Sequence, residues 1–156
     1  LPIKLAKKKP KEVTHVVIAA QRNGKYLFEQ RPSEGLWSNM WQLPTWEDGP
    51  VSRRLQGDAS SKEISFDNAS VDLQAMANKQ LCDWFAERFG LLLDRVEPAA
   101  EFNHQTTHRT IRFVVLQASV KSGRLKPNTG VWRKIDQLDD LPMSNPQHLA
   151  IKKNHP

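Results

Sequence analysis

Cysteine is nearly absent from this sequence, in which Cys82 is the only one among 156 residues. A single cysteine excludes an intrachain disulfide and any four-cysteine metal or iron–sulfur site within the chain, and it favours a reducing compartment. No apolar run approaches the roughly 20 residues that a membrane-spanning helix needs, so we expect no membrane partner. The N-terminus has neither Met nor an apolar signal region, which predicts a piece cut from a longer protein.

The residues that are present are typical of one globular domain, with 38% hydrophobic and 26% charged side chains. A chain of this length buries roughly 70% of its unfolded surface, which is enough to form a core without disulfides or bound metals. The net charge of +6 favours a polyanionic partner. Five lysines lie within residues 1–11, among them Lys8 and Lys9. We interpret this segment as an exposed linker, either a solubilising tether or a basic arm along phosphates.

The pattern of apolar residues and turn signals predicts an α+β fold: a mixed β-sheet with one main amphipathic helix and a short C-terminal helix. The folded domain would cover 12–156, with a polar surface insertion at 47–70. Turn residues Asn23 and Gly24 indicate a hairpin, Gly90 ends the main helix and Ser144 opens the last one. The predicted strands are 13–20, 26–31, 96–108, 110–120 and 131–135, and the main helix is 71–89.

This order of elements resembles the Nudix hydrolase family, whose signature is Gly-x5-Glu-x7-Arg-Glu-U-x-Glu-Glu-x-Gly-U, with U an aliphatic residue. When the end of the signature is aligned with Gly90 and Leu91, Glu87 is the one helix carboxylate that remains. The other positions hold residues that cannot bind a divalent cation, namely Ala69, Ala75, Trp84 and Arg88. The family's carboxylates hold the cations that activate water. We therefore expect no catalytic residue and no metal in this chain.

Several segments narrow the resemblance to the C-terminal domain of the MutY family of adenine DNA glycosylases. Gln-Arg-Pro, Gly-Leu-Trp and Leu-Pro stretches are similar to that family's, as is a segment resembling its Phe-Ser-His-x-Phe-Thr-His. In this sequence they are 30–32, 35–37, 43–44 and 102–108. The resemblance implies recognition of 8-oxoguanine opposite a mispaired adenine in base excision repair.

The same resemblance implies partners and a location. An N-terminal glycosylase domain in cis would carry an iron–sulfur cluster and remove the adenine, so this chain would be neither catalytic nor cofactor-binding by itself. Its other partner would be duplex DNA containing 8-oxoguanine:adenine, bound by a monomer. The location would be cytoplasmic and nucleoid-associated in a bacterium, or nuclear in a eukaryote.

The residues that match the lesion-contacting Phe-Ser-His are Phe102, Asn103 and His104. An Asn amide offers a donor and an acceptor side by side, which suits the N7–H and O8 of 8-oxoguanine. Phe102 would wedge against a base step and His104 would donate to the lesion or a phosphate. The sequence departs from the family at Asn103, where Ser is usual. The alternative is that Asn103 only satisfies backbone groups of a strand-end loop.

Two histidines, His104 and His108, are four residues apart, a spacing that suits a metal only on a helix. The intervening Thr106 and Thr107 favour a strand, so we expect a structural His108 beside the loop and no metal site. The expected lesion- or DNA-binding residues also include His108, and the basic residues expected to meet phosphates include Lys8, Lys9, Arg31 and Arg109.

Two alternatives stay open. The first is an active Nudix-type nucleotide diphosphate hydrolase in which Glu47, Asp48 or Glu63 replaces the lost helix carboxylates. The second is a degenerate Nudix-like module that binds protein partners.

Overall fold

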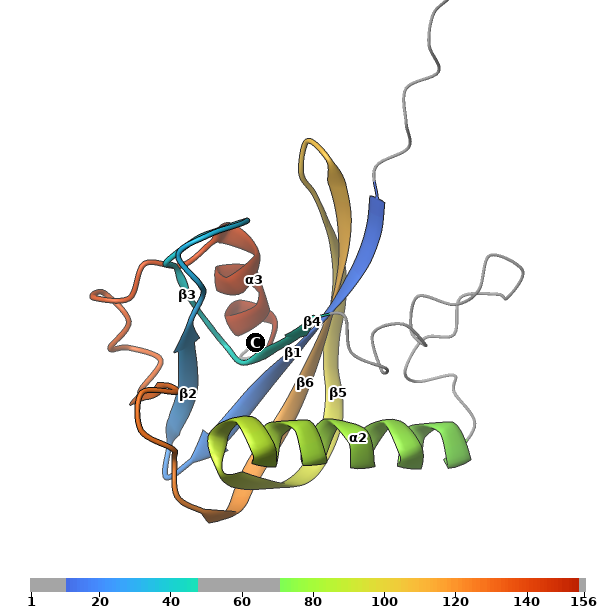
Figure 1. The fold of residues 1–156 in the computed structure, drawn as a ribbon, viewed down its shortest axis with the longest axis vertical. Helices are drawn as coiled ribbons and strands as arrows, with labels where there is room; N and C mark the ends of the chain where they lie inside the picture. Colours follow the sequence, from blue (N-terminus) through green and yellow to red (C-terminus); the bar gives the residue numbers. More distant parts are fainter. Residues whose placement is uncertain (1–10, 48–70, 155–156) are drawn as a thin grey trace, which may run out of the picture.

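The computed structural model describes residues 11–47 and 71–154, except for the side chains of Lys11 and 71–77. Seven strands form one mixed sheet and two helices pack against it, which confirms the predicted α+β class (Figure 1). The elements in chain order are β1 (Lys11–Arg22), β2 (Lys25–Gln30), β3 (Trp41–Gln42), β4 (Thr45–Glu47), α2 (Val71–Phe89), β5 (Leu91–Gln105), β6 (Arg109–Gly123), β7 (Val131–Arg133) and α3 (Asn145–Asn154).

The centre of the sheet is a parallel pair, β1 and β6, and every other strand pairing is antiparallel. The main strand order is β3-β2-β1-β6-β5, while β4 pairs with β1 and β7 pairs with β2. The hairpin between β1 and β2 is confirmed: Asn23 and Gly24 have φ angles of 54° and 75°, as a type I′ turn requires. The middle of β1, residues 16–20, is a continuous apolar run because both of its faces are covered.

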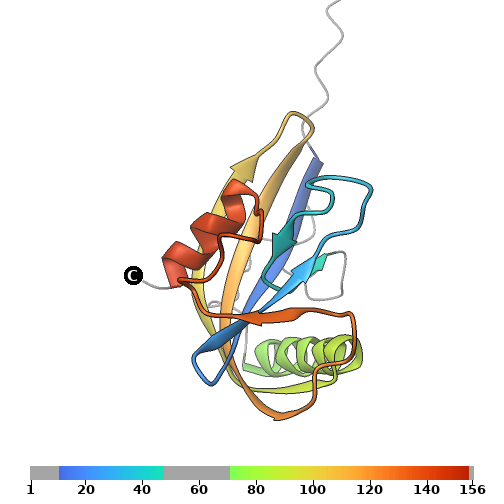
Figure 2. The ribbon, with the colours of Figure 1, turned by 90° about the vertical axis from the view of Figure 1, so that its left-hand side faces the viewer.

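The two helices cover opposite faces of the sheet (Figures 1 and 2). On one face, Leu81, Phe85 and Phe89 of α2 pack against alternate residues of β1 and β6, including Ile18 and Leu116. On the other face, α3 packs against the residues in between, which are Val17, Ala19, Ile111, Phe113 and Val115. Alternate residues of each central strand therefore belong to two separate hydrophobic cores.

Helix α2 has the predicted bounds, and Gly90 follows it with φ of 77°. A Cβ on Gly90 would lie 2.7 Å from the carbonyl oxygen of Arg124, so both conformation and space require glycine there. The terminal helix also begins as predicted, since the Ser144 carbonyl accepts hydrogen bonds from Gln147 and His148.

Several predicted boundaries were wrong. β5 begins at Leu91 because that residue is fully buried in the core, and β6 continues through the turn predicted at 121–123, where Gly123 pairs with Leu91. The turn between β5 and β6 lies at 106–108. Lys11 starts β1 and Glu47 ends β4, so each of the predicted surface segments loses one residue to the sheet. The rest of those segments, 1–10 and 48–70, lies outside the described residues.

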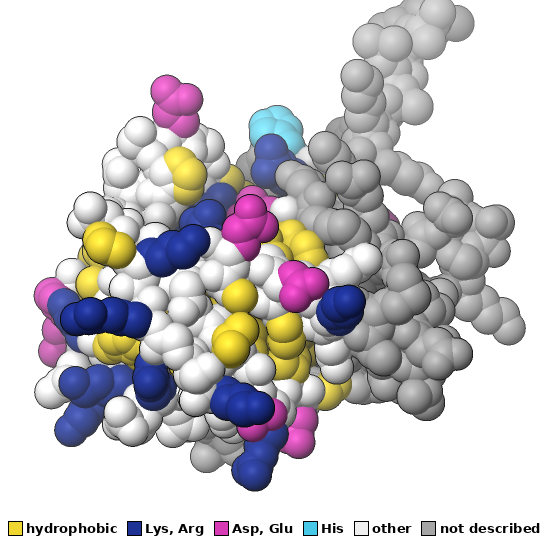
Figure 3. All heavy atoms as spheres, turned by 60° about the horizontal axis from the view of Figure 1, so that its bottom comes forward, with side chains coloured by type: hydrophobic (Ala, Val, Ile, Leu, Met, Phe, Trp, Pro, Cys, Tyr) yellow, Lys and Arg dark blue, Asp and Glu magenta, His cyan; other side chains and the backbone are white. Residues whose placement is uncertain are grey.

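The two ends of the sheet differ in character. At one end the β5–β6 hairpin projects beyond both helices (Figures 1 and 2). The opposite end, which holds the β1–β2 turn and the C-terminus of α2, presents many Lys and Arg side chains (Figure 3). Neither of the helices that the structure describes is long and apolar enough to cross a membrane.

Candidate functional site

The tip of the β5–β6 hairpin holds most of the residues that the sequence singled out. A three-residue turn joins the strands and is closed by two hydrogen bonds. The Thr106 amide donates to the Arg109 carbonyl at 2.8 Å, and the Arg109 amide donates to Thr106 Oγ1 at 3.1 Å. His108 and Arg109 are exposed at this turn. β1 begins beside it, because Lys11 is in register with Arg109. Lys8 and Lys9 lie outside the described residues.

Phe102 is part of the hydrophobic core beneath the hairpin. Its ring stacks on that of the fully buried Phe113, with centroids 5.1 Å apart and an interplanar angle of 17°. The Nζ of Lys153, on α3, lies 5.9 Å from the Phe102 ring centroid. A side chain held between a core residue and a helix has little freedom to enter a base stack. Phe102 therefore supports the hairpin by packing in the core beneath it.

Asn103 and His104 point to opposite faces of the sheet, because neighbouring residues of a strand alternate. Both belong to β5 and not to a strand-end loop. Asn103 is exposed and is in register with Arg112, whose guanidinium pairs with Glu101 at 2.5 Å. His104 is half-buried and shares the α3 face with Phe102. One flat ligand surface cannot contact all three predicted side chains unless it reaches around the edge of the hairpin.

His104 contacts Trp37, a residue that the sequence analysis did not assign to this site. The ring centroids of Trp37 and His104 are 5.8 Å apart, and Trp37 also lies 6.3 Å from Phe113. Trp37 has φ of 54°, a left-handed conformation that costs a non-glycine residue roughly 1 kcal/mol. Strain of this kind persists only where surrounding contacts hold it, and it clusters at functional positions. In the sequence, the only sign that Trp37 belongs to this site was the Gly-Leu-Trp stretch at 35–37.

Arg31 holds the loop that carries Trp37, and it does not lie at the hairpin tip. Its guanidinium donates to the Leu36 carbonyl at 2.9 Å, to Gln42 Oε1 at 3.0 Å and to Glu47 Oε1 at 2.5 Å. Its side chain is only 12% exposed. With three acceptors already engaged, Arg31 positions the loop rather than presenting a free charge to phosphate.

A second cluster of polar residues lies in the cleft next to α2, the helix with which the Nudix signature aligns. Glu29 is only 2% exposed, and one of its carboxylate oxygens accepts two hydrogen bonds from Arg88, at 2.9 and 3.2 Å. The other oxygen lies 3.4 Å from Gln42 Nε2 and from the Thr45 amide nitrogen. Burial raises the pKa of the Glu29 carboxyl above its ordinary value, and Arg88 with these hydrogen bonds opposes the rise.

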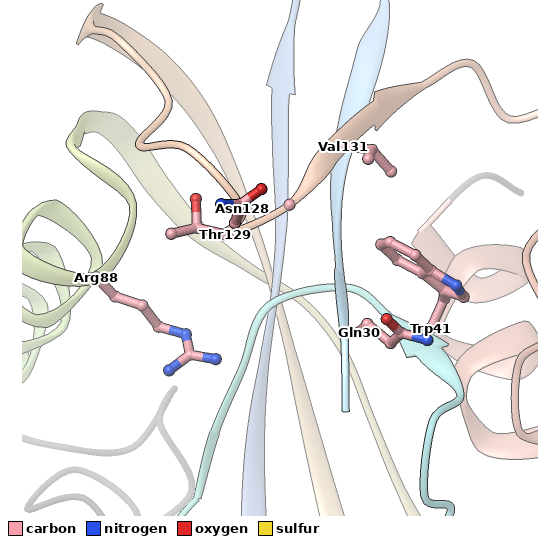
Figure 4. Close-up of a pocket in the computed structure, with 7 residues that line it drawn as sticks. Gln30, Trp41, Arg88, Asn128, Thr129 and Val131 are labelled. Carbon is pink, nitrogen blue, oxygen red and sulfur yellow. The ribbon is translucent and has the colours of Figure 1, made fainter. Parts of the chain in front are cut away.

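Aromatic residues form the wall of this cleft. Trp84 stacks on Trp46 with ring centroids 5.2 Å apart and an interplanar angle of 1°. The cleft adjoins a cavity of about 700 Å³, across which Arg88 faces Gln30 and Trp41 (Figure 4). Trp84 is half-buried and packed against the α2-side core, as the apolar stripe of the helix predicts.

These side chains do not fit a divalent cation. The position of one signature carboxylate holds Arg88, whose positive charge already neutralises Glu29. Trp84 occupies the position of a second signature carboxylate. Glu87, the signature carboxylate that remains, is exposed on the helix. Glu47, the described member of the alternative carboxylates, is bound by Arg31, while Asp48 and Glu63 lie outside the described residues. Within 11–47 and 71–154, no group of three or more His, Cys, Asp or Glu residues is arranged to hold a metal ion.

Solved structures with the same fold include a hydrolase and domains of two other proteins. A MutT NUDIX hydrolase from Burkholderia pseudomallei is 16% identical with a TM-score of 0.61, covering 92% of this chain and 98% of its own. The C-terminal domain of mouse MUTYH, solved in complex with human PCNA, is 15% identical with a TM-score of 0.60, covering 93% and 87%. The NUDIX domain of Shewanella oneidensis NrtR, complexed with ADP ribose, is 13% identical with a TM-score of 0.59, covering 94% and 86%.

At these identities the structural likeness shows the fold alone. The family model described as NUDIX domain matches residues 15–153. This range includes every strand of the sheet except the first residues of β1, and nearly all of α3. The chain therefore belongs to the NUDIX domain family.

Proposed function

We propose that this chain is the 8-oxoguanine-recognition domain of an adenine DNA glycosylase and that it does not hydrolyse nucleotides. The observation that carries the proposal is the ion pair between Arg88 and the buried Glu29, which stands where the family's cation-binding carboxylates would lie. A Nudix fold modified in this way is suited to binding. The glycosylase-like segment 102–108 supplies the specific partner, duplex DNA containing 8-oxoguanine opposite adenine.

The hairpin tip gives this proposal its chemistry. Asn103 is exposed, and its amide can donate and accept next to the base edge that distinguishes 8-oxoguanine from guanine. His104, on the other face, is held by Trp37 and provides a second polar group. His108 and Arg109 at the turn would contact phosphates. The MUTYH neighbour supports the proposal because a domain of that glycosylase has this fold. An upstream domain with an iron–sulfur cluster would remove the adenine.

The decisive experiment compares excision rates in the intact glycosylase. We expect Asn103→Ala to reduce the preference for adenine opposite 8-oxoguanine over adenine opposite guanine by about 5- to 150-fold, since removal of a base-edge hydrogen bond costs about 1–3 kcal/mol. Single-turnover excision on the two duplexes measures this ratio. Gln117→Ala, an exposed change in the middle of β6, is the control. An unchanged ratio in the Asn103 variant would show that Asn103 does not read the lesion.

An active hydrolase is the second candidate, because several neighbours are named as hydrolases. This function would require carboxylates outside the α2 helix to hold the cations. Incubation of the chain with 8-oxo-dGTP and Mg²⁺ tests it directly. We expect no monophosphate above the level of a protein-free control, and release that is abolished by Glu47→Gln would establish the hydrolase instead.

A further inference from the structure

Five basic residues gather at the end of the sheet opposite the hairpin tip, and we call this group the basic end: Arg22, Lys25, Lys121, Arg124 and Lys126. The β1–β2 turn brings in the first two, since Arg22 pairs with Lys25. The Arg22 guanidinium donates to the carbonyl of Gly123 at 2.8 Å, which joins this turn to the end of β6. The Lys126 ammonium donates to the Glu87 carbonyl and joins the group to the end of α2.

The charges of the basic end are not neutralised within the fold. By contrast, Arg31, Arg88 and Arg112 each pair with a carboxylate. In the described part of the chain, none of the five residues of the basic end forms an ion pair. Lys25, Lys121 and Arg124 are exposed. The basic side chains stand out on this face of the molecule (Figure 3). Positive charge that costs self-repulsion and has no internal partner is suited to an external polyanion.

The basic end is far from the hairpin tip. β5 and β6 run the whole distance between them, each with 15 residues, and an extended strand rises by about 3.3 Å per residue. The two surfaces are therefore on the order of 45 Å apart at opposite ends of the molecule (Figure 1). A duplex that crosses the hairpin tip perpendicular to β5 and β6 does not reach the basic end.

We propose that the basic end is a second surface for duplex DNA, which binds phosphates without regard to lesion or sequence. The inference goes beyond the proposed function and takes from it only that the partner is duplex DNA. Phosphate contacts need exposed point charges and no apolar anchor. A protein partner would need an apolar centre. Near the basic end, the one large hydrophobic side chain that the described surface exposes is Leu92, at 51%.

The test measures binding of the 156-residue chain to a short duplex that contains no lesion and no mismatch. Lys25→Gln with Arg124→Gln removes two exposed charges that take no part in the ion pairs of the described fold. Lys79→Gln with Lys152→Gln, on the exposed faces of α2 and α3, is the control with the same net charge. Binding is followed by fluorescence anisotropy over a range of salt concentrations, and polyglutamate is added as a competitor at a matched charge concentration.

We expect the double variant at the basic end to bind about tenfold or more weakly at low salt. The plot of its log affinity against log salt should become less steep by roughly 1.8, because each phosphate that is no longer neutralised reduces the steepness by about 0.9. The control should keep the slope of the unmodified chain. Equal decreases in affinity for both double variants would show that only the net charge of the chain matters, and this result would overturn the proposal. Stronger competition by polyglutamate than by unlabelled duplex would overturn it in favour of an acidic protein partner.

This outcome is separable from that of the proposed function. A changed slope in the basic-end variant together with an unchanged lesion preference in Asn103→Ala would support the second surface and refute the assignment of the hairpin. The reverse pair of results would leave lesion recognition at the hairpin and remove the second surface.

Discussion

The cleft beside α2 and the hairpin tip use polar residues in opposite ways. In the cleft, the buried Glu29 carboxylate is satisfied by Arg88, Gln42 and the Thr45 amide, so its polar groups bind one another. At the hairpin tip, Asn103 and Arg109 are exposed, on a scaffold held by Phe102 and Phe113. The polar groups of the cleft are thus already paired with one another. The polar side chains of the projecting hairpin are exposed.

Under the proposed function, the difference teaches that a fold can keep its architecture while the position of its function moves. A buried ion pair adds little net stability, but the loss of one partner leaves an uncompensated charge. The cleft is therefore sensitive to mutation without needing a ligand. The hairpin tip should show the reverse behaviour, with small losses of stability and large losses of recognition.

The largest effect on stability should come from breaking the cleft pair. Arg88→Met leaves the Glu29 carboxylate buried without its cation and should lower the free energy of unfolding at neutral pH by about 3 kcal/mol. Urea denaturation monitored by tryptophan fluorescence measures it. Lys79→Met, an exposed change on the same helix, should cost under about 0.5 kcal/mol.

The stability of the Arg88→Met variant should also depend on pH in a distinctive way. Because burial raises the pKa of Glu29 in the folded state, the folded protein holds this proton more tightly than the unfolded chain. The contribution of Glu29 to stability is thus present below its unfolded-state pKa and decreases as pH rises toward its folded-state pKa. Loss of Arg88 raises the folded-state pKa further, so the deficit of Arg88→Met should shrink as pH is lowered. A deficit independent of pH would contradict the charge mechanism.

A smaller effect on stability, but a specific one on recognition, is expected at Trp37. Trp37→Ala should cost about 2 kcal/mol, because the residue is only half-buried, and it should reduce lesion preference by releasing His104. Trp37→Phe keeps a ring against His104 and should retain most of the preference. Excision ratios for the two duplexes separate the roles: a Trp37→Ala variant that is less stable but equally selective would make Trp37 purely structural.

The stacked pair in the cleft wall should show coupling on the order of 1 kcal/mol. A double-mutant cycle with Trp46→Leu and Trp84→Leu measures it from urea denaturation, since stacked aromatic pairs contribute beyond the area that they bury. Lesion preference should not change in any of the three variants. Strictly additive losses would show that the two rings only fill space.

The smallest effect is expected at the ion pair next to Asn103. Glu101 is 40% exposed, so Glu101→Gln should change stability by less than about 0.5 kcal/mol. Duplex affinity should rise slightly, because a negative charge next to Asn103 is removed. Glu97→Gln on the same strand gives the same change in net charge as a control. A decrease of about 2 kcal/mol or more would mean that the pair is part of the hairpin scaffold.

Local patterns predicted the elements of this fold, and long-range pairings lay beyond them. The 71–89 helix, its Gly90 stop and the Asn23-Gly24 turn follow from residues near one another in sequence. The contact of Arg88 with Glu29 joins residues 59 positions apart, and no periodicity encodes it. The alternation of Asn103 and His104 follows from the predicted strand 96–108, which contains both residues. The role of Trp37 depends on a left-handed backbone angle that is unusual for tryptophan.

The register of β1 with β6 has a consequence for the proposed glycosylase. Lys11 begins the sheet beside Arg109, so the chain enters the sheet at the hairpin end and not at the basic end. A tethered partner raises the effective concentration of whatever it holds near its attachment point. DNA held by an upstream domain would therefore be delivered to the hairpin as an intramolecular event, while the basic end would still have to capture its duplex from solution.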